Sequence, residues 1–237
     1  MKKLLTALLI VAGVGTAQAE VSTNLGAVSD YRFRGISQTQ NAPAVQGGID
    51  YVHASGLYAG NWNSSVSSEV YTNGAGLESD LYAGYRTKVG GVVVDMGSYN
   101  YVYARAGSTA GTKFDTSEVY VAATYGPVTV KASQAVTDYF GIANSRGTRY
   151  YQADVAYPIA PKWTVTAHAG QTAVANSSTL SFVDYNIGAT YDLSGWAISA
   201  KYHMNSAMGS SVVGANTVAG QDLTKNTVVV SATRSFN

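Results

Sequence analysis

The stretch Val183-Asp184-Tyr185-Asn186-Ile187-Gly188-Ala189-Thr190-Tyr191-Asp192 decides the fold, because apolar and polar residues alternate in it without a break. A period of two puts successive side chains on opposite faces of an extended strand, one apolar and one polar. The same alternation runs through 163–172 and 196–205. No segment shows a clear period of 3.6 residues, so the sequence predicts an all-β protein.

Short turns and long polar loops alternate along the rest of the chain. The short turns lie near 54–56, 89–91, 126–127, 158–161 and 193–195, and the long loops near 35–43, 66–76, 105–115, 140–147, 174–180 and 206–223. The expected strands are 22–34, 44–54, 57–65, 77–88, 92–103, 116–125, 128–138, 148–157, 163–173, 181–192, 196–205 and 225–236. An even number of such strands is typical of a transmembrane antiparallel up-and-down β-barrel. Ten strands instead of twelve is the alternative, because Asn61-Trp62-Asn63 interrupts the pattern.

The N-terminus has the pattern of a secretory signal peptide. Lys2 and Lys3 precede an apolar run over 4–14, and Ala17-Gln18-Ala19 is a small-residue cleavage site. The apolar run is too short to cross a bilayer core of roughly 30 Å as a helix. We expect a signal peptide over 1–19, cleavage between Ala19 and Glu20, and a barrel over 20–237 with both termini in the periplasm.

Composition narrows the class of protein further. Charged residues make up 12% of the chain, the net charge is +1 and there is no cysteine. Average soluble proteins carry about 25% charged residues. The charge balance offers no basic field for nucleic acid. An outer-membrane barrel of a Gram-negative bacterium and a soluble periplasmic ligand-binding barrel remain possible.

The aromatic residues favour the membrane barrel, because they are predicted to form two belts on the apolar face. Next to the short turns lie Tyr51, Tyr85, Tyr125, Tyr157, Trp163, Tyr191, Trp196 and Phe236. Nearer the long loops lie Tyr31, Phe33, Tyr101, Tyr103, Tyr151, Tyr185 and Tyr202. Tyr and Trp favour the lipid–water boundary, where the ring is in apolar surroundings and its polar atom stays wet. The expected partner of this face is outer-membrane lipid.

Charged side chains of both signs recur on the opposite face. The candidate pore-lining residues are Asp30, Arg32, Arg34, Asp50, Asp80, Arg86, Asp95, Glu118, Lys131, Asp154, His168, Asp184, Lys201 and His203. The proposed filter residues among them are Asp30, Arg32, Arg34, Arg86, Lys131, Asp154, Asp184 and Lys201. So many charges require a watered lumen rather than a packed core. Twelve strands close at a backbone radius of roughly 12 Å, which allows ions and small solutes to pass. The mixed signs argue against strong ion selectivity.

Catalytic and metal-binding patterns are weak by comparison. Counting back from Leu193-Ser194 places Asp184 opposite His203, with Ser199 two pairs away, whereas His168 is expected to face the lumen alone. A His–carboxylate pair can orient a base, but the sequence supplies no convincing nucleophile. No metal-ligand spacing and no phosphate-binding glycine loop appears, and the loop acids are sparse: Glu69, Glu78, Asp115 and Asp222. We expect no enzyme activity, no metal and no cofactor.

The first expected strand and loop contain Ser29-Asp30-Tyr31-Arg32-Phe33-Arg34-Gly35-Ile36-Ser37-Gln38. This stretch resembles the TorF family of proteobacterial porins, in which Ser-Asp-Tyr-x-Phe-Arg-Gly-x-Ser-Gln opens the mature chain. The gapless match is confined to this region, and it implies a porin-like role without naming a solute. The residues themselves allow two interpretations: a charged constriction at the extracellular mouth, or an internal salt-bridge cluster that stiffens the wall.

The expected function is therefore a passive channel for ions or small hydrophilic solutes. The alternatives are a closed structural or adhesive barrel that acts through its long loops, and a lipid-modifying barrel enzyme. Phe236 next to the C-terminus is expected to engage the barrel-insertion machinery. The sequence does not specify an oligomeric state.

Overall fold

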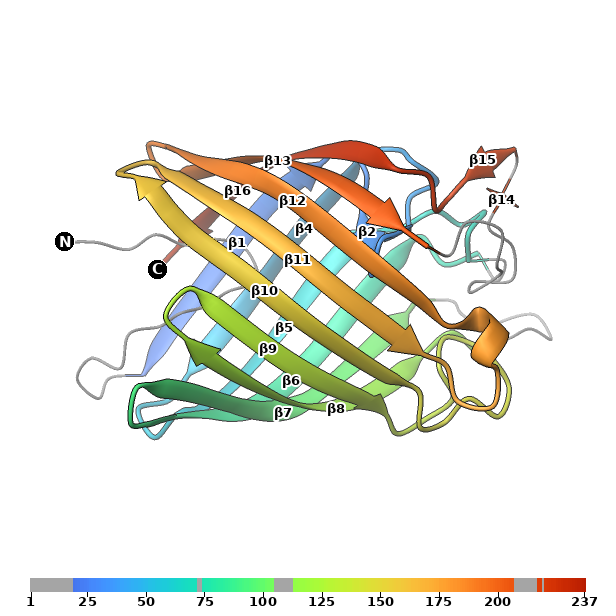
Figure 1. The fold of residues 1–237 in the computed structure, drawn as a ribbon, viewed down its shortest axis with the longest axis horizontal. Helices are drawn as coiled ribbons and strands as arrows, with labels where there is room; N and C mark the ends of the chain where they lie inside the picture. The colour runs from blue at the N-terminus through green and yellow to red at the C-terminus, as the bar shows by residue number, and fades with distance from the viewer. Residues whose placement is uncertain (1–18, 72–73, 105–112, 207–216, 219) are drawn as a thin grey trace.

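The computed structural model describes residues 19–71, 74–104, 113–206, 217–218 and 220–237, and its central feature is a closed barrel (Figure 1). Twelve strands form this barrel: β1 (Glu20–Val28), β4 (Ala44–Val52), β5 (Leu57–Ser65), β6 (Leu77–Val89), β7 (Val92–Tyr103), β8 (Thr116–Tyr125), β9 (Val128–Ala135), β10 (Arg149–Ala160), β11 (Trp163–Ala173), β12 (Phe182–Leu193), β13 (Trp196–Asn205) and β16 (Thr227–Phe236). The prediction of twelve strands is confirmed, and the ten-strand alternative is wrong. β5 runs without interruption through Asn61-Trp62-Asn63 and pairs with β6 along its whole length.

Every pair of neighbouring strands is antiparallel, and β1 closes the barrel by pairing with β16. The start of β1 and the end of β16 lie at the same end of the barrel, because Thr23 pairs with Phe236 (Figure 1). We call this the short-turn end, because tight turns such as Ser194-Gly195 join the strands there. The long loops gather at the opposite long-loop end. The expected signal peptide falls almost entirely on residues 1–18, which lie outside the described part of the chain.

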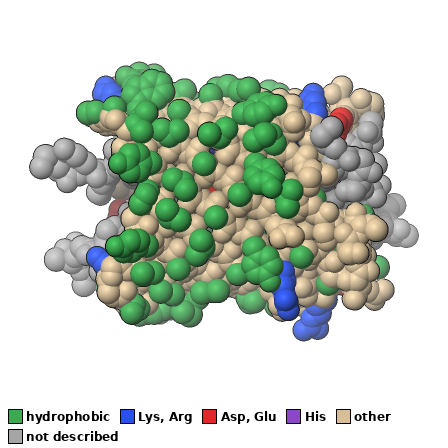
Figure 2. All heavy atoms as spheres, in the orientation of Figure 1, with side chains coloured by type: hydrophobic (Ala, Val, Ile, Leu, Met, Phe, Trp, Pro, Cys, Tyr) green, Lys and Arg blue, Asp and Glu red, His purple; other side chains and the backbone are tan. Residues whose placement is uncertain are grey.

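The wall of the barrel has an apolar outer face. Leu25, Ile49, Val121 and Ile187 are each about half exposed on it. Figure 2 shows apolar side chains spread over the wall, with Lys and Arg near its two ends. No helix among the described residues is long and apolar enough to cross a membrane.

Inward tyrosines pack over glycines of neighbouring strands. A Cβ added at Gly60 would lie 2.5 Å from the Tyr82 ring, and one added at Gly84 would overlap the Tyr58 hydroxyl. A glycine in a strand marks such close approach, since any side chain would displace the ring. These contacts explain why residues that favour strands poorly recur within the β5–β6 pair.

The chain departs from the expected strands at the long-loop end. The first strand ends at Val28 and not at residue 34, and β9 ends at Ala135 and not at 138. Short elements occupy the loops: β2 (Arg32–Phe33), β3 (Ile36–Ser37), η1 (Ser178–Leu180), β14 (Thr217–Val218) and β15 (Gln221–Asp222). These departures matter because the long loops hold most of the buried apolar residues.

The apolar core is a cluster at the long-loop end rather than a layer along the barrel. Its members are Tyr31, Ile36, Ala44, Val66, Val70, Tyr71, Ala75, Tyr101, Tyr103, Phe114, Ala135, Tyr139, Phe140, Phe182 and Leu223. They come from the loops and from the inward ends of the adjoining strands. The described parts of the loops therefore fold into the mouth of the barrel and pack against its inner wall.

Candidate functional site in the barrel lumen

All of the predicted pore-lining residues lie on the inward side of the wall or in the loop folded into its mouth. Asp50, Asp80, Arg86, Asp95, Glu118, Lys131, Asp154, His168, Asp184, Lys201 and His203 are on the buried parity of their strands, and Asp30, Arg32 and Arg34 precede or belong to the β2–β3 hairpin. Alternation of side chains along a strand was enough to place the barrel-strand members of this set on the inner face, whereas Asp30, Arg32 and Arg34 lie in the loop after β1.

Residues 29–43, which connect β1 to β4, form what we call the mouth plug. Its β2–β3 hairpin pairs Arg32 with Ser37 and Phe33 with Ile36. The two turn residues have positive φ angles, 49° at Arg34 and 78° at Gly35. Two-residue turns of this kind need φ above zero at both positions, which favours glycine at the second. The Arg-Gly pair of the motif is therefore the tip of a tight hairpin.

Gly35 sits where no side chain fits. A Cβ there would lie 2.6 Å from Asn205 Nδ2 and 2.9 Å from Asp184 Cβ. Asn205 Nδ2 also donates a 3.1 Å hydrogen bond to the Arg34 carbonyl. The tip of the plug thus rests against the inner faces of β12 and β13.

Arg34 reaches across the lumen from this tip. Its Nη2 lies 2.7 Å from Glu118 Oε2 on β8, and its Nη1 donates a 2.9 Å hydrogen bond to the Tyr139 hydroxyl. Its guanidinium lies 4.0 Å from the centre of the Tyr150 ring on β10. Because β8 and β10 lie across the ring of strands from β1 and β4, this side chain ties opposite walls together. Burial alone lowers the pKa of the Arg34 guanidinium, whereas the Glu118 carboxylate raises it, and the net shift is upward.

Arg32 and Asp30 form a second buried ion pair within the plug. Arg32 Nε lies 2.7 Å from Asp30 Oδ2, and the two side chains are 1% and 6% exposed. Nη1 of Arg32 donates to the carbonyls of Gly35 and Lys225 at 3.0 and 2.9 Å. The Ser37 hydroxyl donates to the other Asp30 oxygen at 2.6 Å. Of the two interpretations of the motif, this geometry favours the internal salt-bridge cluster over a constriction open to solvent.

The prediction that Tyr31 and Phe33 belong to the outer aromatic belt is wrong, because both side chains point into the barrel. The Tyr31 hydroxyl donates a 3.0 Å hydrogen bond to Glu78, and its ring packs against Trp62. Burial and the Glu78 charge raise the pKa of the Tyr31 phenol well above its ordinary value. Phe33 packs edge-on against Tyr101 and against Phe140. The alternating pattern continued past Val28 because β2 is also extended, but there the chain has left the wall.

Three further residues at this end differ from expectation. Tyr101 and Tyr103 are only 7% and 3% exposed, since they share the inward parity of Asp95 on β7. Glu78, expected as a loop acid, is a fully buried inward residue of β6. Its spacing of two from Asp80 was the signal that could have placed it.

Ion pairs and tyrosine hydrogen bonds order the lumen below the plug. Arg86 Nη2 lies 2.6 Å from Asp95 Oδ2, and the Tyr58 hydroxyl donates to Asp95 Oδ1 at 2.6 Å. The Tyr82 hydroxyl donates to Asp50 at 2.6 Å. The Asp95 carboxylate is therefore bound by an arginine and a tyrosine hydroxyl, and the Asp50 carboxylate by a tyrosine hydroxyl.

His168 does not face the lumen alone, because it lies between two carboxylates. Its Nδ1 lies 2.7 Å from Asp154 Oδ1 and its Nε2 lies 3.0 Å from Asp184 Oδ1. The Tyr150 hydroxyl donates to both oxygens of Asp184. Donation by both ring nitrogens requires the doubly protonated, cationic imidazole. The arrangement suits a structural bridge across β10, β11 and β12.

The expected pairing of Asp184 with His203 is wrong, because the register of β12 and β13 differs from the expected one by two residues. The turn is formed by Ser194-Gly195 and not by Leu193-Ser194, so Asp184 pairs with Asn205 and Asn186 pairs with His203. A shift of one residue in a turn moves the register by two. The Ser199 hydroxyl is engaged by the Ser231 hydroxyl at 2.7 Å. The His–Asp–Ser arrangement considered for catalysis is thus not assembled.

The two inward lysines lack a carboxylate within salt-bridge distance among the described residues. Lys131 Nζ lies 4.1 Å from the centre of the Tyr120 ring, where the negative face of the ring attracts a cation. Lys201 lies on the inner face of β13, opposite Gly188. No group of three His, Cys, Asp or Glu side chains in the described ranges is arranged to hold a metal ion.

The remaining aromatic residues of the two predicted belts lie on the outer parity of their strands. Tyr51, Tyr85, Tyr125, Tyr151, Tyr157, Trp163, Tyr185, Tyr202 and Phe236 are exposed, and Tyr191 and Trp196 are partly exposed. The Trp163 and Tyr191 rings contact each other across β11 and β12. The outer face therefore carries these rings together with the exposed aliphatic residues, whereas Tyr31, Phe33, Tyr101 and Tyr103 are inside.

Comparison with known families gives a match over residues 12–236 to a family described as a bacterial protein of unknown function, Gcw_chp. This chain belongs to the Gcw_chp family. No curated protein matches the chain in sequence. The fold of this Gcw_chp protein is similar to that of the KdgM porin, with a TM-score of 0.56 and 10% identity over 91% of this chain and 99% of that one. The NanC porin is similar at a TM-score of 0.55 and 11% identity, over 92% of this chain and all of that one. At this level of identity the likeness establishes a shared porin barrel fold.

Proposed function

We propose that this protein is a non-enzymatic outer-membrane channel that passes ions and small hydrophilic solutes. The observation that carries the proposal is the two-sided wall: a closed barrel with an apolar outer face and charged residues inside. Such a wall suits lipid outside and water inside. The shared fold with KdgM and NanC and the TorF-like stretch of the mouth plug support the same function. A solved KdgM structure holds disordered oligogalacturonate, which makes an acidic sugar a reasonable solute to test here.

The proposal includes an orientation and two partners. The signal peptide, cleaved before Glu20, would deliver the chain to the periplasm, and both termini would stay there with the short turns. Outer-membrane lipid would surround the wall, and the last strand with Phe236 would engage the barrel-insertion machinery. The pore would run along the charged inner face, past Arg86, Lys131 and Lys201.

A closed barrel that acts through its long loops is the second candidate. The apolar cluster in the long-loop mouth and the Arg34–Glu118 tie favour it, because both hold the mouth plug inside the barrel. In the channel proposal the same plug narrows the entrance. The two candidates differ in whether the native barrel conducts.

Single-channel conductance in a planar bilayer separates them. The protein would be purified from the outer membrane of an expressing Gram-negative host and shown to be folded by its heat-modifiable mobility on a gel. Steady current steps that grow with salt would support the channel. Folded, inserted protein that gives no steps would contradict it and favour the closed barrel.

A further inference from the structure

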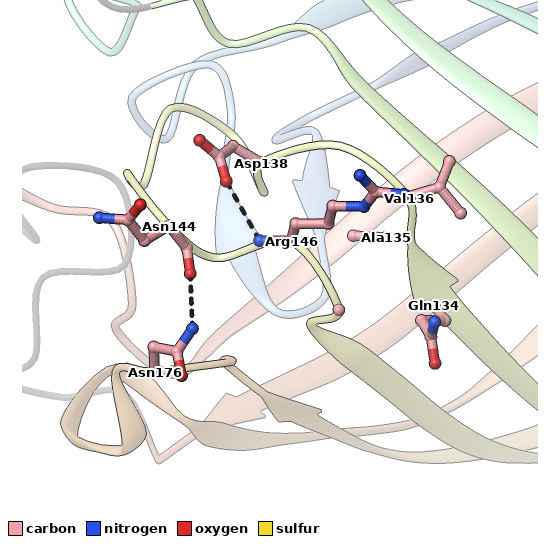
Figure 3. Close-up of a pocket in the computed structure, with 8 residues that line it drawn as sticks. Gln134, Ala135, Val136, Asp138, Asn144, Arg146 and Asn176 are labelled. Carbon is pink, nitrogen blue, oxygen red and sulfur yellow. Dashed lines mark hydrogen bonds between the residues drawn. The ribbon is translucent and has the colours of Figure 1, made fainter.

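A recess of about 610 Å³ opens among the long loops beyond the end of β9. Its lining is Gln134, Ala135, Val136, Asp138, Asn144, Arg146, Gly147 and Asn176, drawn from the end of β9 and from two long loops (Figure 3). Asn176 donates a 2.9 Å hydrogen bond to the Asn144 carbonyl and so joins the two loops. The recess is thus bounded by the strand end on one side and by a linked pair of loops on the other.

The height of the recess on the barrel places it next to the aromatic belt. Gln134 pairs with Arg149, and the next outward pair toward the barrel centre is Ala132 with Tyr151. Tyr151 is 46% exposed and belongs to the predicted belt. Belt tyrosines mark the boundary where hydrocarbon gives way to headgroups. The recess therefore starts one residue pair above that boundary, at headgroup level.

The recess and its border carry two arginines that form no salt bridge within the described part of the chain. Arg146 and Arg149 are exposed, and neither forms a salt bridge with a described residue. Arg149 Nε donates a 3.3 Å hydrogen bond to Gln134, a residue of the lining. Figure 3 shows the Arg146 side chain reaching toward Val136 at the end of β9. The one acid of the lining, Asp138, accepts a hydrogen bond from the Arg146 backbone N–H at 3.1 Å. Two cations against one carboxylate leave the recess positive.

From this placement we propose that the recess binds the phosphate-bearing headgroup of an anionic membrane lipid. Arginine binds phosphate oxygens through two parallel N–H groups, and exposed amides such as those of Asn144 and Asn176 suit the hydroxyl groups of a headgroup. The lipid chains would run down the apolar wall beside Tyr151. The inference rests on the proposed membrane location of the barrel, and it is independent of whether the barrel conducts.

Native mass spectrometry of the detergent-purified barrel tests the site, with phosphatidylglycerol and phosphatidylcholine as the added lipids. The wild type is expected to retain phosphatidylglycerol in preference to phosphatidylcholine. Arg146→Gln with Arg149→Gln should weaken this retention roughly tenfold or more, since each basic residue near an anionic lipid contributes substantially. Lys113→Gln with Lys225→Gln removes the same charge from exposed positions elsewhere on the long loops and should change little.

Equal lipid retention by the two double variants would overturn the proposal. So would displacement of phosphatidylglycerol by equimolar inorganic phosphate, because the site would then prefer a soluble anion. Heat-modifiable mobility on a gel confirms that each variant is folded. Failure of the wild type to insert into lipid would instead contradict the proposed function, so the two failures are distinguishable.

Discussion

Single side chains at the long-loop end join parts of the wall that are distant around the ring. Arg34 is the clearest case, because its ion pair with Glu118 is nearly sealed from solvent, at 6% and 2% exposure. A buried ion pair adds little net stability over apolar residues, but removing one partner leaves a charge stranded. The loss of stability caused by each substitution therefore depends on whether the remaining partner keeps another group that compensates its charge.

Arg34→Gln is expected to lower the free energy of unfolding by about 3 kcal/mol, since it strands the Glu118 carboxylate. Arg34→Gln with Glu118→Gln should recover most of that loss. Urea unfolding in vesicles, followed by tryptophan fluorescence, measures both. Arg86→Gln is the control: its pair with Asp95 is more open to water, at 21% and 17% exposed, so a smaller loss of about 1–2 kcal/mol is expected there, between the values for exposed and buried pairs. Equal stability of the two single variants would contradict the buried-pair argument.

The alternation of polar and apolar residues correctly predicted which charged side chains of the barrel strands point inward. Alternation is a property of the extended backbone, so Asp50, Lys131 and Asp154 could be placed without knowing any contact. Contacts between strands depend on register, which the choice of turn residues sets. One misassigned turn residue at 193–195 was enough to pair Asp184 with His203 in place of Asn205. The Asp154–His168–Asp184 bridge depends instead on how β11 pairs with β10 and with β12.

At the scale of elements, the β2–β3 hairpin is the feature that sequence periodicity could not separate from the wall. Its residues are extended and alternate like those of β1, yet they pair with each other and not with a barrel strand. The Arg34-Gly35 turn and the loop after it are the sequence features that indicate that the chain leaves the wall here and forms a separate hairpin. Strand number, by contrast, follows from counting alternating segments, and it was predictable.

Gly35→Ala is expected to loosen the mouth plug, because it adds backbone strain and a steric clash with Asn205 and Asp184. Gly74→Ala is the matched control: Gly74 also has a positive φ, of 81°, but no atom lies within 4 Å of an added Cβ. Strain of about 1–2 kcal/mol is common to both, and the clash belongs to Gly35 alone. Single-channel recording should show a larger or more frequent open state for Gly35→Ala only. Identical currents from the two variants would argue that the plug does not limit conduction.

At the scale of the whole molecule, the outer face of the barrel is apolar and the inner face is charged, and the proposed function depends on this contrast. The apolar core lies at one end, in the loops, and the wall below it is a single layer of strands with exposed apolar residues outside. In the proposed membrane location these residues face lipid. Stability of such a wall depends on the lipid as much as on internal packing. The depth of each outward residue should therefore govern its tolerance to charge.

Val121→Arg is expected to cost about 2–4 kcal/mol of stability in vesicles, because Val121 is a half-exposed outward residue in the middle of β8. Leu77→Arg is the control at the edge of the band: Leu77 is exposed at the first residue of β6, and a cost of about 0–1 kcal/mol is expected. Urea unfolding in phospholipid vesicles gives both values. A soluble periplasmic barrel would show no such depth dependence, and that outcome would contradict the membrane location.

The summed charge of the lumen leads to an expected ion preference. Asp30, Glu118 and Asp95 are each matched by an arginine, and Asp154 and Asp184 share His168. Glu78 and Asp80 are sealed beneath the plug, at 0% and 3% exposure, and Asp50 is 8% exposed. One His168 shared by two aspartates leaves a carboxylate unmatched, so the sum of these charges gives no net positive lumen. Lys131 and Lys201 form no salt bridge in the described part of the chain and offset the remaining carboxylates, so removing them should shift the preference toward cations.

Reversal potentials in a potassium chloride gradient measure this preference. Lys131→Gln with Lys201→Gln should lower the chloride-to-potassium permeability ratio roughly twofold, since a unit charge about 8 Å from an ion in water contributes about 0.5 kcal/mol. The effect should shrink in 1 M salt, where the screening length falls to about 3 Å. Lys113→Gln with Lys225→Gln, on the outer loops, is the control and should leave the ratio unchanged. A ratio that moves equally in both double variants would mean that the loops and not the lumen set the selectivity.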